Sequence, residues 1–306
     1  MLPVWRGPSE SEARDKPHYW RTVELEADGG LLVQTDYGAL ARIDRRSRVL
    51  WELDVRTHHD FDVREDGRVF VLINEFIEHE RYGRGIDDIV LEVDPQGVAH
   101  RRVSVVDALI AGGQSEVLAE IAAYRGSASG VPRMDITHAN SLDLVGSVGA
   151  PQHPAFVGGR MLLSLRTVHR LVLLDFDAGR VVWTLAGSFR TQHDPSLVGE
   201  HILLFDDSGP GSHSSALEIE SATGATRRAY AEEGTKAFFS ECCGRVHRLA
   251  NGNTLIVASN PGLAIEVTVD GQPVWEYRNP EQTNGHVAIL SDVVRIPAER
   301  ARWRLQ

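Results

Sequence analysis

Three histidines lie at equivalent places in successive β-rich segments of the sequence. They are His59, His138 and His193, and each follows the end of one segment and begins the next. An imidazole titrates near neutral pH, so it can transfer a proton, attack an electrophile or bind a metal ion. Repeated strands return equivalent positions to the same region of space. We therefore expect these histidines to converge on one site.

Arg166 is expected to join the three histidines. In a four-stranded blade the first strand runs down and the second runs up, so the start of the first and the end of the second share a face. The histidines stand at the starts of first strands, which are innermost, and Arg166 ends a second strand. The sequence therefore predicts a polar pocket at the axial opening of one face, where a rigid scaffold commonly binds its ligand.

The elements that would hold these residues are repeated units of four strands. A Val/Leu-x-Trp pattern closes units at Trp51, Trp183 and Trp275, in steps of roughly 45 residues that fit a propeller blade. Asp-Gly and Asn-Gly pairs supply turns between the strands. In the second unit we expect strands over residues 59–63, 68–74, 87–94 and 98–103, with a polar loop over residues 74–85.

The units together predict an all-β fold, a six-bladed β-propeller of four-stranded antiparallel blades, in a single domain over residues 1–306. Five units are complete. The sixth is expected from residues 293–297 and 301–305, closed by a strand around Trp5. A five-bladed ring with a C-terminal extension is the alternative.

One insertion, spanning about residues 104–133, interrupts the repeat. Apolar residues at helical spacing predict one or two short helices over residues 106–123. The insertion is either a linker between blades or a lid over the predicted pocket.

The composition excludes several classes of protein. The chain has 306 residues and a net charge of −11, which argues against a nucleic-acid partner. No apolar run is long enough to cross a bilayer, so we expect no membrane partner. The two cysteines are adjacent, which rules out a disulfide framework and favours a reducing compartment. The N-terminal residues lack the apolar core of a secretory signal, so the sequence as it stands predicts a cytoplasmic location.

Four short motifs, taken in order, resemble those of the PAPS-independent arylsulfate sulfotransferase family. They are His-Asp at 59–60, His-x-Asn-Ser at 138–141, Ser-x-Arg at 164–166 and Thr-Gln-His at 191–193. Segments 238–240 and 246–255 also resemble later blades of the family, so the resemblance runs from about Tyr19 to Ala298. Each motif alone is weak, but their order and spacing over nearly the full chain are specific.

The resemblance implies an enzyme that moves a sulfuryl group from an aryl sulfate to a phenol by a ping-pong route. The group travels on a histidine, and the motif match assigns that role to His193. A neutral imidazole nitrogen can attack sulfur, and the sulfated imidazole is a good leaving group for the second half-reaction. The resemblance implies no nucleotide sulfate donor, no cofactor and no metal ion in the chemical step.

The other matched residues receive supporting roles, each beside a plainer alternative. His59 and His138 are candidates for acid/base transfer, or each caps its strand, and His58 competes with His59 for this role. Arg166 would bind the three sulfuryl oxygens, or form a surface ion pair. Asn140 would donate to a sulfuryl oxygen, or serve as a turn amide.

The sequence departs from the best-characterised members of the family in three ways. It lacks their N-terminal β-sandwich domain, which leaves monomer and homodimer both open. It shows no export signal, so a periplasmic location is the family-based alternative. Cys243 stands at about the position where a threonine hydroxyl is expected, which makes it a candidate for substrate binding.

Two other classes of function remain as alternatives. A metal-dependent propeller hydrolase or lactonase would use the histidines as zinc or copper ligands, although an arginine in the cluster would repel a dication. A non-catalytic binding propeller would use the same ring of side chains to hold a partner. Metal analysis of the purified protein separates the first of these from the sulfotransferase.

Overall fold

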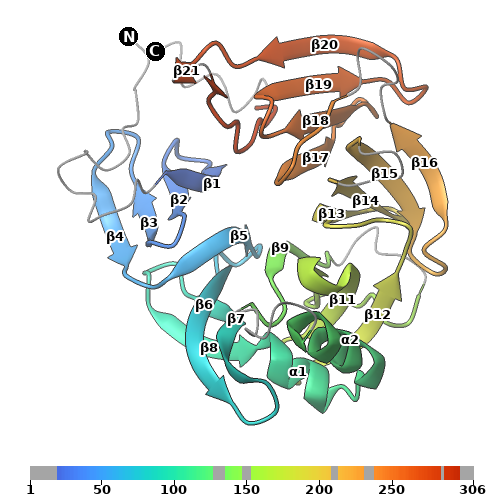
Figure 1. The fold of residues 1–306 in the computed structure, drawn as a ribbon. Coiled ribbons are helices and arrows are strands. Elements are labelled where there is room, and N and C mark those ends of the chain that lie inside the picture. Colours follow the sequence, from blue (N-terminus) through green and yellow to red (C-terminus); the bar gives the residue numbers. More distant parts are fainter. Residues whose placement is uncertain are drawn as a thin grey trace. The chain divides into compact units, whose positions relative to one another are not determined.

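The computed structural model describes residues 19–126, 135–146, 153–207, 213–230, 238–283 and 286–296. Within these residues lie five four-stranded antiparallel sheets and one two-stranded sheet (Figure 1). Each four-stranded sheet pairs strands that are consecutive in the sequence, which is the architecture of a propeller blade. The fold class is thus an all-β β-propeller with five blades, and the prediction of six blades is wrong.

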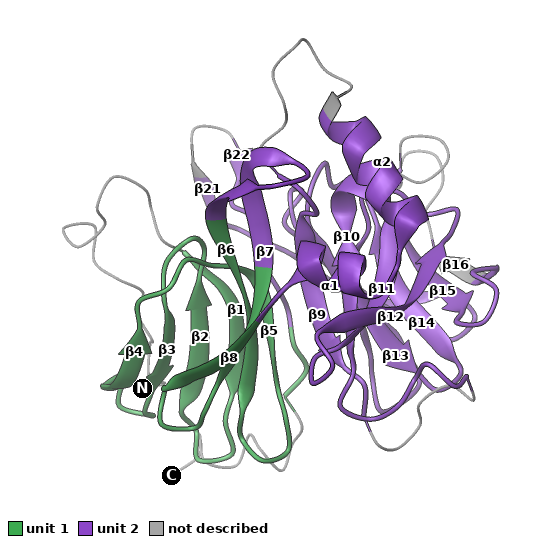
Figure 2. Cartoon of the chain, turned by 90° about the horizontal axis from the view of Figure 1, so that it is seen from below, with its two compact units in different colours: residues 1–75, 89–102, 294–306 green, residues 76–88, 103–293 purple. Residues whose placement is uncertain are grey.

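Three blades belong to one compact unit, residues 76–88 and 103–293 (purple in Figure 2). Their strands are β9 (Ala139–Leu144), β10 (Met161–Leu165), β11 (Arg170–Asp175) and β12 (Arg180–Ala186); β13 (His193–Val198), β14 (His201–Asp206), β15 (Ser215–Glu220) and β16 (Thr226–Tyr230); and β17 (Gly244–Arg248), β18 (Thr254–Ala258), β19 (Leu263–Val267) and β20 (Pro273–Arg278). The short strands β21 (Gln282–Thr283) and β22 (His286–Val287) follow.

The inner strands of these blades are apolar on both faces because each sheet packs against its neighbours. Every residue of β10 is buried, whereas every residue of β20, the outermost strand of its blade, is exposed. One hydrophobic cluster joins β10 and β11 to β14 and β15, and a second joins β14 and β15 to β17, β18 and β19. This packing fixes the strand ends that carry the candidate site.

The other compact unit comprises residues 1–75, 89–102 and 294–306 (green in Figure 2). It holds the blade β1 (Trp20–Leu25), β2 (Leu31–Thr35), β3 (Leu40–Ile43) and β4 (Val49–Leu53), and most of the blade β5 (Thr57–Val63), β6 (Val69–His79), β7 (Gly83–Val93) and β8 (Ala99–Ser104). The far ends of β6 and β7 are counted in the three-blade unit. The prediction of a single domain stays a prediction.

The polar loop expected over residues 74–85 is a hairpin instead. Strand β6 continues to His79, and β7 begins at Gly83, whose φ of 67° suits the tight connection. Exposure alternates along the end of β6: Phe76 and Glu78 are exposed, whereas Ile77 and His79 are half-buried, a period-two pattern that fits a two-stranded ribbon.

The sixth blade fails because its apolar residues are used in another way. Residues 288–296 form no strand, and Leu290 and Val293 pack against the hydrophobic cluster of β18 and β19. An alternating apolar segment can cover a sheet as well as extend one. The remaining parts of the predicted blade, around Trp5 and over residues 301–305, lie outside the described residues.

The insertion contains the two predicted helices, α1 (Val105–Ala111) and α2 (Ser115–Gly126). Charged contacts fasten α2 at both ends. Arg170 lies 2.9 Å from Glu116 and 2.5 Å from Glu120, and Arg125 donates a 2.9 Å hydrogen bond to the carbonyl of Tyr82. No helix among the described residues combines the length and apolar character that crossing a bilayer requires.

Candidate active site

The candidate site in the three-blade unit is built from irregular strand starts. Strands β9 and β13 each begin with a bulge that shifts their register against β10 and β14. Nearby backbones are left-handed: φ is 49° at His138, 50° at Thr191, 52° at Asp194 and 69° at Cys243. Such conformations are costly for residues other than glycine and cluster at functional sites. The bulges re-aim side chains that a regular strand would direct elsewhere.

His193 forms a buried pair with Asp207. It starts β13 opposite Phe205 on β14, and Asp207 follows the end of that neighbouring strand. The imidazole Nδ1 lies 2.9 Å from the carboxylate Oδ2, although the N–H is not aimed along this line, so the contact is an ion pair rather than a well-directed hydrogen bond. The side chain of His193 is 6% exposed and that of Asp207 is fully buried.

This pairing changes how His193 titrates. Burial by itself lowers the pKa of the imidazole, but the charge and contact of Asp207, together with the Cys243 side chain, raise the pKa of His193 to about 9. Burial raises the pKa of the Asp207 carboxyl, against the opposing charges of His193 and Arg166. His193 is therefore mainly an imidazolium at neutral pH.

Gln192 fixes the backbone of His193 to the preceding blade. Its side-chain nitrogen donates to Ser164 Oγ at 3.0 Å, and to the carbonyls of Arg170 at 3.2 Å and Leu165 at 3.3 Å. Its own carbonyl accepts from Asn140 Nδ2 at 2.8 Å and from Ser164 Oγ at 3.1 Å. Ser164 and Gln192, which belong to the Ser-x-Arg and Thr-Gln-His motifs, thus position His193 through this set of hydrogen bonds.

Asn140, which the sequence predicts to bind a sulfuryl oxygen, forms a hydrogen bond within the protein. It is buried, and its amide nitrogen already donates to the backbone. Its Oδ1 is also buried and accepts no hydrogen bond within the described part of the chain. The structure therefore gives Asn140 a positioning contact, and its predicted contact with substrate stays a prediction.

His138 lies beside Arg166, which the sequence analysis places at the same site. The carbonyl oxygen of His138 accepts a 3.1 Å hydrogen bond from the backbone N–H of Arg166, and its Nδ1 lies 2.9 Å from Asp135 Oδ2. Asp88 holds the strained turn by accepting from Thr137 Oγ1 and, at 2.7 Å, from the N–H of Ala139. The imidazole is 22% exposed, so a ligand or solvent can reach it.

Arg166 begins the short 3-10 helix η1 (Arg166–Val168) that follows β10. It is half-buried, and no side chain in the described ranges forms an ion pair with its guanidinium. Its charge nevertheless reaches the site, since it lowers the pKa of Asp207 and of His169. A guanidinium in this position is available to an anionic ligand.

Cys243 closes the site from the next blade. It immediately precedes β17, and its side chain lies near enough to His193 to help raise the pKa of the imidazole. Buried Ser240 anchors the turn, because its Oγ donates to the carbonyl of Cys243 at 2.7 Å. The structure therefore brings Cys243 close to His193, while its contact with substrate stays a prediction.

His58 and His59 form their own pair in the unit of residues 1–75. Their Nδ1 atoms are 2.9 Å apart, both residues are buried, and His59 has a φ of 58°. Thr22 Oγ1 donates to the carbonyl of His59 at 2.8 Å. His59 thus shares the left-handed backbone of His138, while its convergence with His138 and His193 stays a prediction.

Sequence reasoning missed Asp207 and the structural role of Gln192. One signal was present: Asp207 immediately follows the second strand of its blade, the place that Arg166 takes in the blade before. His169 is also part of this framework, because it is half-buried and its Nδ1 accepts from the N–H of Thr191 at 3.0 Å.

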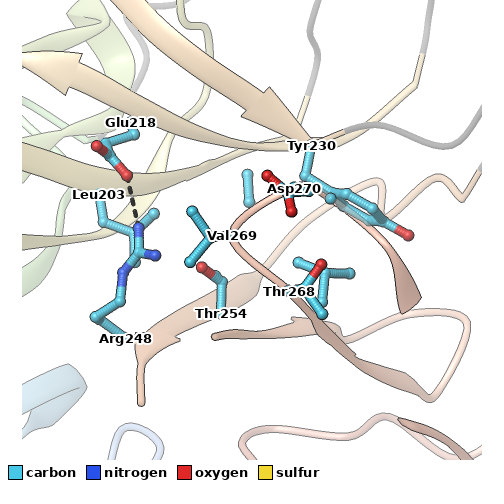
Figure 3. Close-up of a pocket in the computed structure, with 11 residues that line it drawn as sticks. Leu203, Glu218, Tyr230, Arg248, Thr254, Thr268, Val269 and Asp270 are labelled. Atoms are coloured by element: carbon cyan, nitrogen blue, oxygen red, sulfur yellow. Dashed lines mark hydrogen bonds and ion pairs between the residues drawn. The ribbon is translucent and has the colours of Figure 1, made fainter. Parts of the chain in front are cut away.

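A cavity of about 310 Å³ lies between the last two blades of the same unit, away from these residues. A 2.6 Å ion pair between Glu218 and Arg248 borders it, with Tyr230 and Asp270 (Figure 3). Arg248 ends β17, whereas Cys243 precedes the start of that strand. The cavity therefore lies toward the end of β17 that is far from Cys243, and none of the predicted site residues lines it.

Comparison with known proteins identifies the family of the chain. The family model for arylsulfotransferase (ASST) matches residues 10–280, so the chain belongs to the arylsulfotransferase family. Comparison with curated proteins gave no match.

Two solved structures show the same fold. A protein of unknown function from Bacteroides caccae aligns with a TM-score of 0.58 and 14% identity, over 90% of this chain and 87% of that one. Hydrazine synthase from Kuenenia stuttgartiensis aligns with a TM-score of 0.52 and 12% identity, over 92% of this chain and 72% of that one. At such identities the likeness concerns the fold alone.

Proposed function

We propose that the chain is an arylsulfate sulfotransferase that passes a sulfuryl group from an aryl sulfate to a phenol through His193. Family membership supports sulfuryl transfer in general. The observation that carries the assignment to His193 is its 2.9 Å pairing with buried Asp207. With Asp207 at Nδ1, Nε2 is the nitrogen left to attack, and the carboxylate stabilises the positive charge of a sulfated imidazole.

The first half-reaction transfers the sulfuryl group to the enzyme. The Nε2 lone pair of neutral His193 attacks sulfur, the bond from sulfur to the aryl oxygen breaks, and a phenolate leaves. His138, paired with Asp135, gives the phenolate its proton. Arg166, with no ion-pair partner among the described side chains, binds the sulfuryl oxygens as charge develops on them.

The second half-reaction reverses these roles. His138, now deprotonated, accepts the proton of the acceptor phenol, and the phenol oxygen attacks sulfur. The bond between nitrogen and sulfur breaks and returns its electron pair to Nε2. No nucleotide donor or metal ion takes part in this proposed route.

The experiment that tests this proposal measures nitrophenol release from nitrophenyl sulfate, with and without added phenol. We expect release that depends on phenol in the wild type and is lost in His193→Ala. His100→Ala is the matched control, because His100 is an exposed residue that pairs with Asp94 away from the site. Mass analysis after incubation with donor alone should find one sulfuryl group on the peptide that carries His193.

Two results would count against the proposal. Phenol-dependent release that survives in His193→Ala would place the sulfuryl carrier elsewhere. Folded wild-type protein that releases no nitrophenol with any phenol would favour a metal-dependent hydrolase or a binding propeller, which metal analysis of the same preparation separates.

A further inference from the structure

The Cys243 side chain is a reactive group that sulfuryl transfer through His193 leaves unused. The residue sits at a φ of 69°, a conformation that a cysteine adopts only where its surroundings impose it. Ser240 restrains it here: the residue is fully buried, and its hydroxyl lies 2.7 Å from the carbonyl oxygen of Cys243, with the carbonyl of Cys242 and Asn260 Oδ1 also within hydrogen-bond distance. The backbone that carries the Cys243 thiol is therefore held in place at the site.

The neighbours of Cys243 form the arrangement that activates a thiol. Asp194, the neighbour of His193, accepts from the N–H of Val246 at 2.8 Å and pairs with Arg245 at 3.1 Å, so the starts of β13 and β17 are joined. The Cys243 side chain lies close enough to His193 to raise the pKa of its imidazole, whose Nδ1 lies 2.9 Å from Asp207. A nucleophile, a base in hydrogen-bond reach and a third group that orients the base are the parts of a catalytic triad. The three residues come from three separate strand ends. Two hydrophobic clusters, each packed between neighbouring blades, hold these strands in place.

Charge favours the ionised form of this pair. Asp207 and Cys243 both raise the pKa of His193, so an imidazolium persists beside the sulfur at neutral pH. The groups that face the imidazole are Asp207 after β14 and Cys243 before β17, and Arg166 in η1 acts on Asp207. A cation next to a cysteine stabilises the thiolate, which is the nucleophilic form.

We propose that Cys243 is a second nucleophile of this site and that it accepts the acyl group of an activated aryl ester. The Cys243 thiolate attacks the carbonyl carbon, and the tetrahedral oxyanion forms near Arg166. The oxyanion collapses, the bond from carbon to the aryl oxygen breaks, and imidazolium His193 gives its proton to the departing phenolate. Water then attacks the thioester, with neutral His193 taking its proton, and releases a carboxylic acid and the Cys243 thiolate beside an imidazolium.

This acyl transfer uses the same His193–Asp207 pair in the opposite protonation state. Sulfuryl transfer needs neutral His193 as the attacking group, whereas acyl transfer needs the imidazolium as a partner of the thiolate. The second activity does not depend on the first, and each has its own substrate: an aryl ester for one and an aryl sulfate for the other.

Nitrophenyl acetate is the probe for the proposal. We expect a burst of nitrophenol equal to the enzyme concentration, and one acetyl group on Cys243 in peptides from protein quenched during the burst. Cys243→Ala, which keeps a Cβ at the strained φ, should abolish both. Cys242→Ala is the matched control and should keep both, because Cys242 is not among the groups that act on His193.

Alkylation by iodoacetamide tests the thiolate without any substrate. An ordinary thiol, with a pKa of about 8.5, is only a few per cent ionised at neutral pH. We therefore expect Cys243 to react at least about tenfold faster at pH 7 in the wild type than in His193→Ala, with Cys242 as the internal reference. Circular dichroism and the melting temperature confirm that each variant is folded.

The outcomes separate the two proposals. An acetyl group on Cys242 or on His193 instead of Cys243 would overturn the assignment of the second nucleophile, as would equal alkylation rates with and without His193. Failure with nitrophenyl sulfate but a burst with nitrophenyl acetate would remove the sulfotransferase and leave the thiol chemistry standing. The reverse result would remove the thiol chemistry alone.

Discussion

The backbone N–H of Arg166 donates to the carbonyl oxygen of His138 at 3.1 Å, so two residues from neighbouring strand ends are joined without their side chains. The main chain thus sets the spacing of these two residues independently of what their side chains contact. A substitution at either side chain leaves this frame in place. Changes in activity at Arg166 therefore report on its charge and hydrogen bonds rather than on the fold.

The first prediction concerns Arg166. Arg166→Ala should lower kcat/KM for nitrophenyl sulfate by about 100-fold to 1,000-fold, the usual cost of removing one charged or oxyanion-binding donor. Arg166→Lys should recover only part of the loss, because an ammonium cannot offer the planar pair of donors. Steady-state kinetics check this, with Arg180→Ala as control, since Arg180 is an exposed arginine on β12. Equal kinetics for Arg166→Ala and Arg180→Ala would remove Arg166 from the site.

The second prediction concerns the pH dependence of sulfuryl transfer. The attacking histidine must be neutral, and the pKa of His193 lies at about 9, so the limb of the kcat/KM profile that reports His193 should rise with pH through about that value. Asp207→Asn removes the charge that raises this pKa. The rise should then move to lower pH, while the plateau falls because the imidazole loses its orienting partner.

The pH profile of Asp207→Asn decides whether the pair acts as described. Initial rates over a range of pH with nitrophenyl sulfate supply it, and Asp94→Asn is a suitable control because Asp94 pairs with exposed His100. An unchanged midpoint in Asp207→Asn would show that the titrating group is not His193.

Much of the fold was predictable because the signals of a blade are local. Alternating apolar residues and Gly-containing turns identified the strands around His59, apolar residues at helical spacing identified the helices after β8, and the structure confirms both. The blade number was not predictable in this way. Whether the alternating residues near Val293 pair with a strand or pack over a sheet depends on distant residues, here the apolar cluster of β18 and β19.

The candidate site shows the same division. Motif order located His138, Arg166 and His193, and the structure connects all three within the three-blade unit. Asp207 was missed because its contact with His193 depends on a bulge and on the pairing of His193 with Phe205, neither of which leaves a local pattern. Positive φ values at ordinary residues, such as Cys243, are equally invisible in the sequence.

The third prediction concerns stability. The folded pKa of His193, about 9, exceeds the ordinary histidine value near 6.5, so the folded state binds this proton more tightly than the unfolded state. The contribution is complete below about pH 6.5 and is lost as pH rises through about 9. It amounts to a few kcal/mol at most, on the order of 3.

Urea denaturation at several pH values between about 6 and 10 measures this effect. The free energy of unfolding should fall with rising pH more steeply in the wild type than in His193→Gln, because other groups titrate alike in both proteins. Parallel curves would show that the histidine titrates at its ordinary value.

The fourth prediction concerns Gln192, which should act through His193 rather than on substrate. Gln192→Leu keeps a similar volume but leaves the buried Ser164 hydroxyl and the carbonyls of Leu165 and Arg170 without their donor. Leaving buried polar groups unsatisfied costs about 1–3 kcal/mol each, so the free energy of unfolding should fall by at least that amount. Displacement of the neighbouring histidine should also lower kcat by about tenfold or more with little change in KM, since misplacing a reacting group slows the chemical step.

Gln96→Leu, at an exposed turn, is the control and should change neither quantity. If Gln192→Leu were destabilised but kept its full kcat, the hydrogen bonds around Gln192 would serve the fold alone, and the placement of His193 would have to come from the β13 bulge and Asp207.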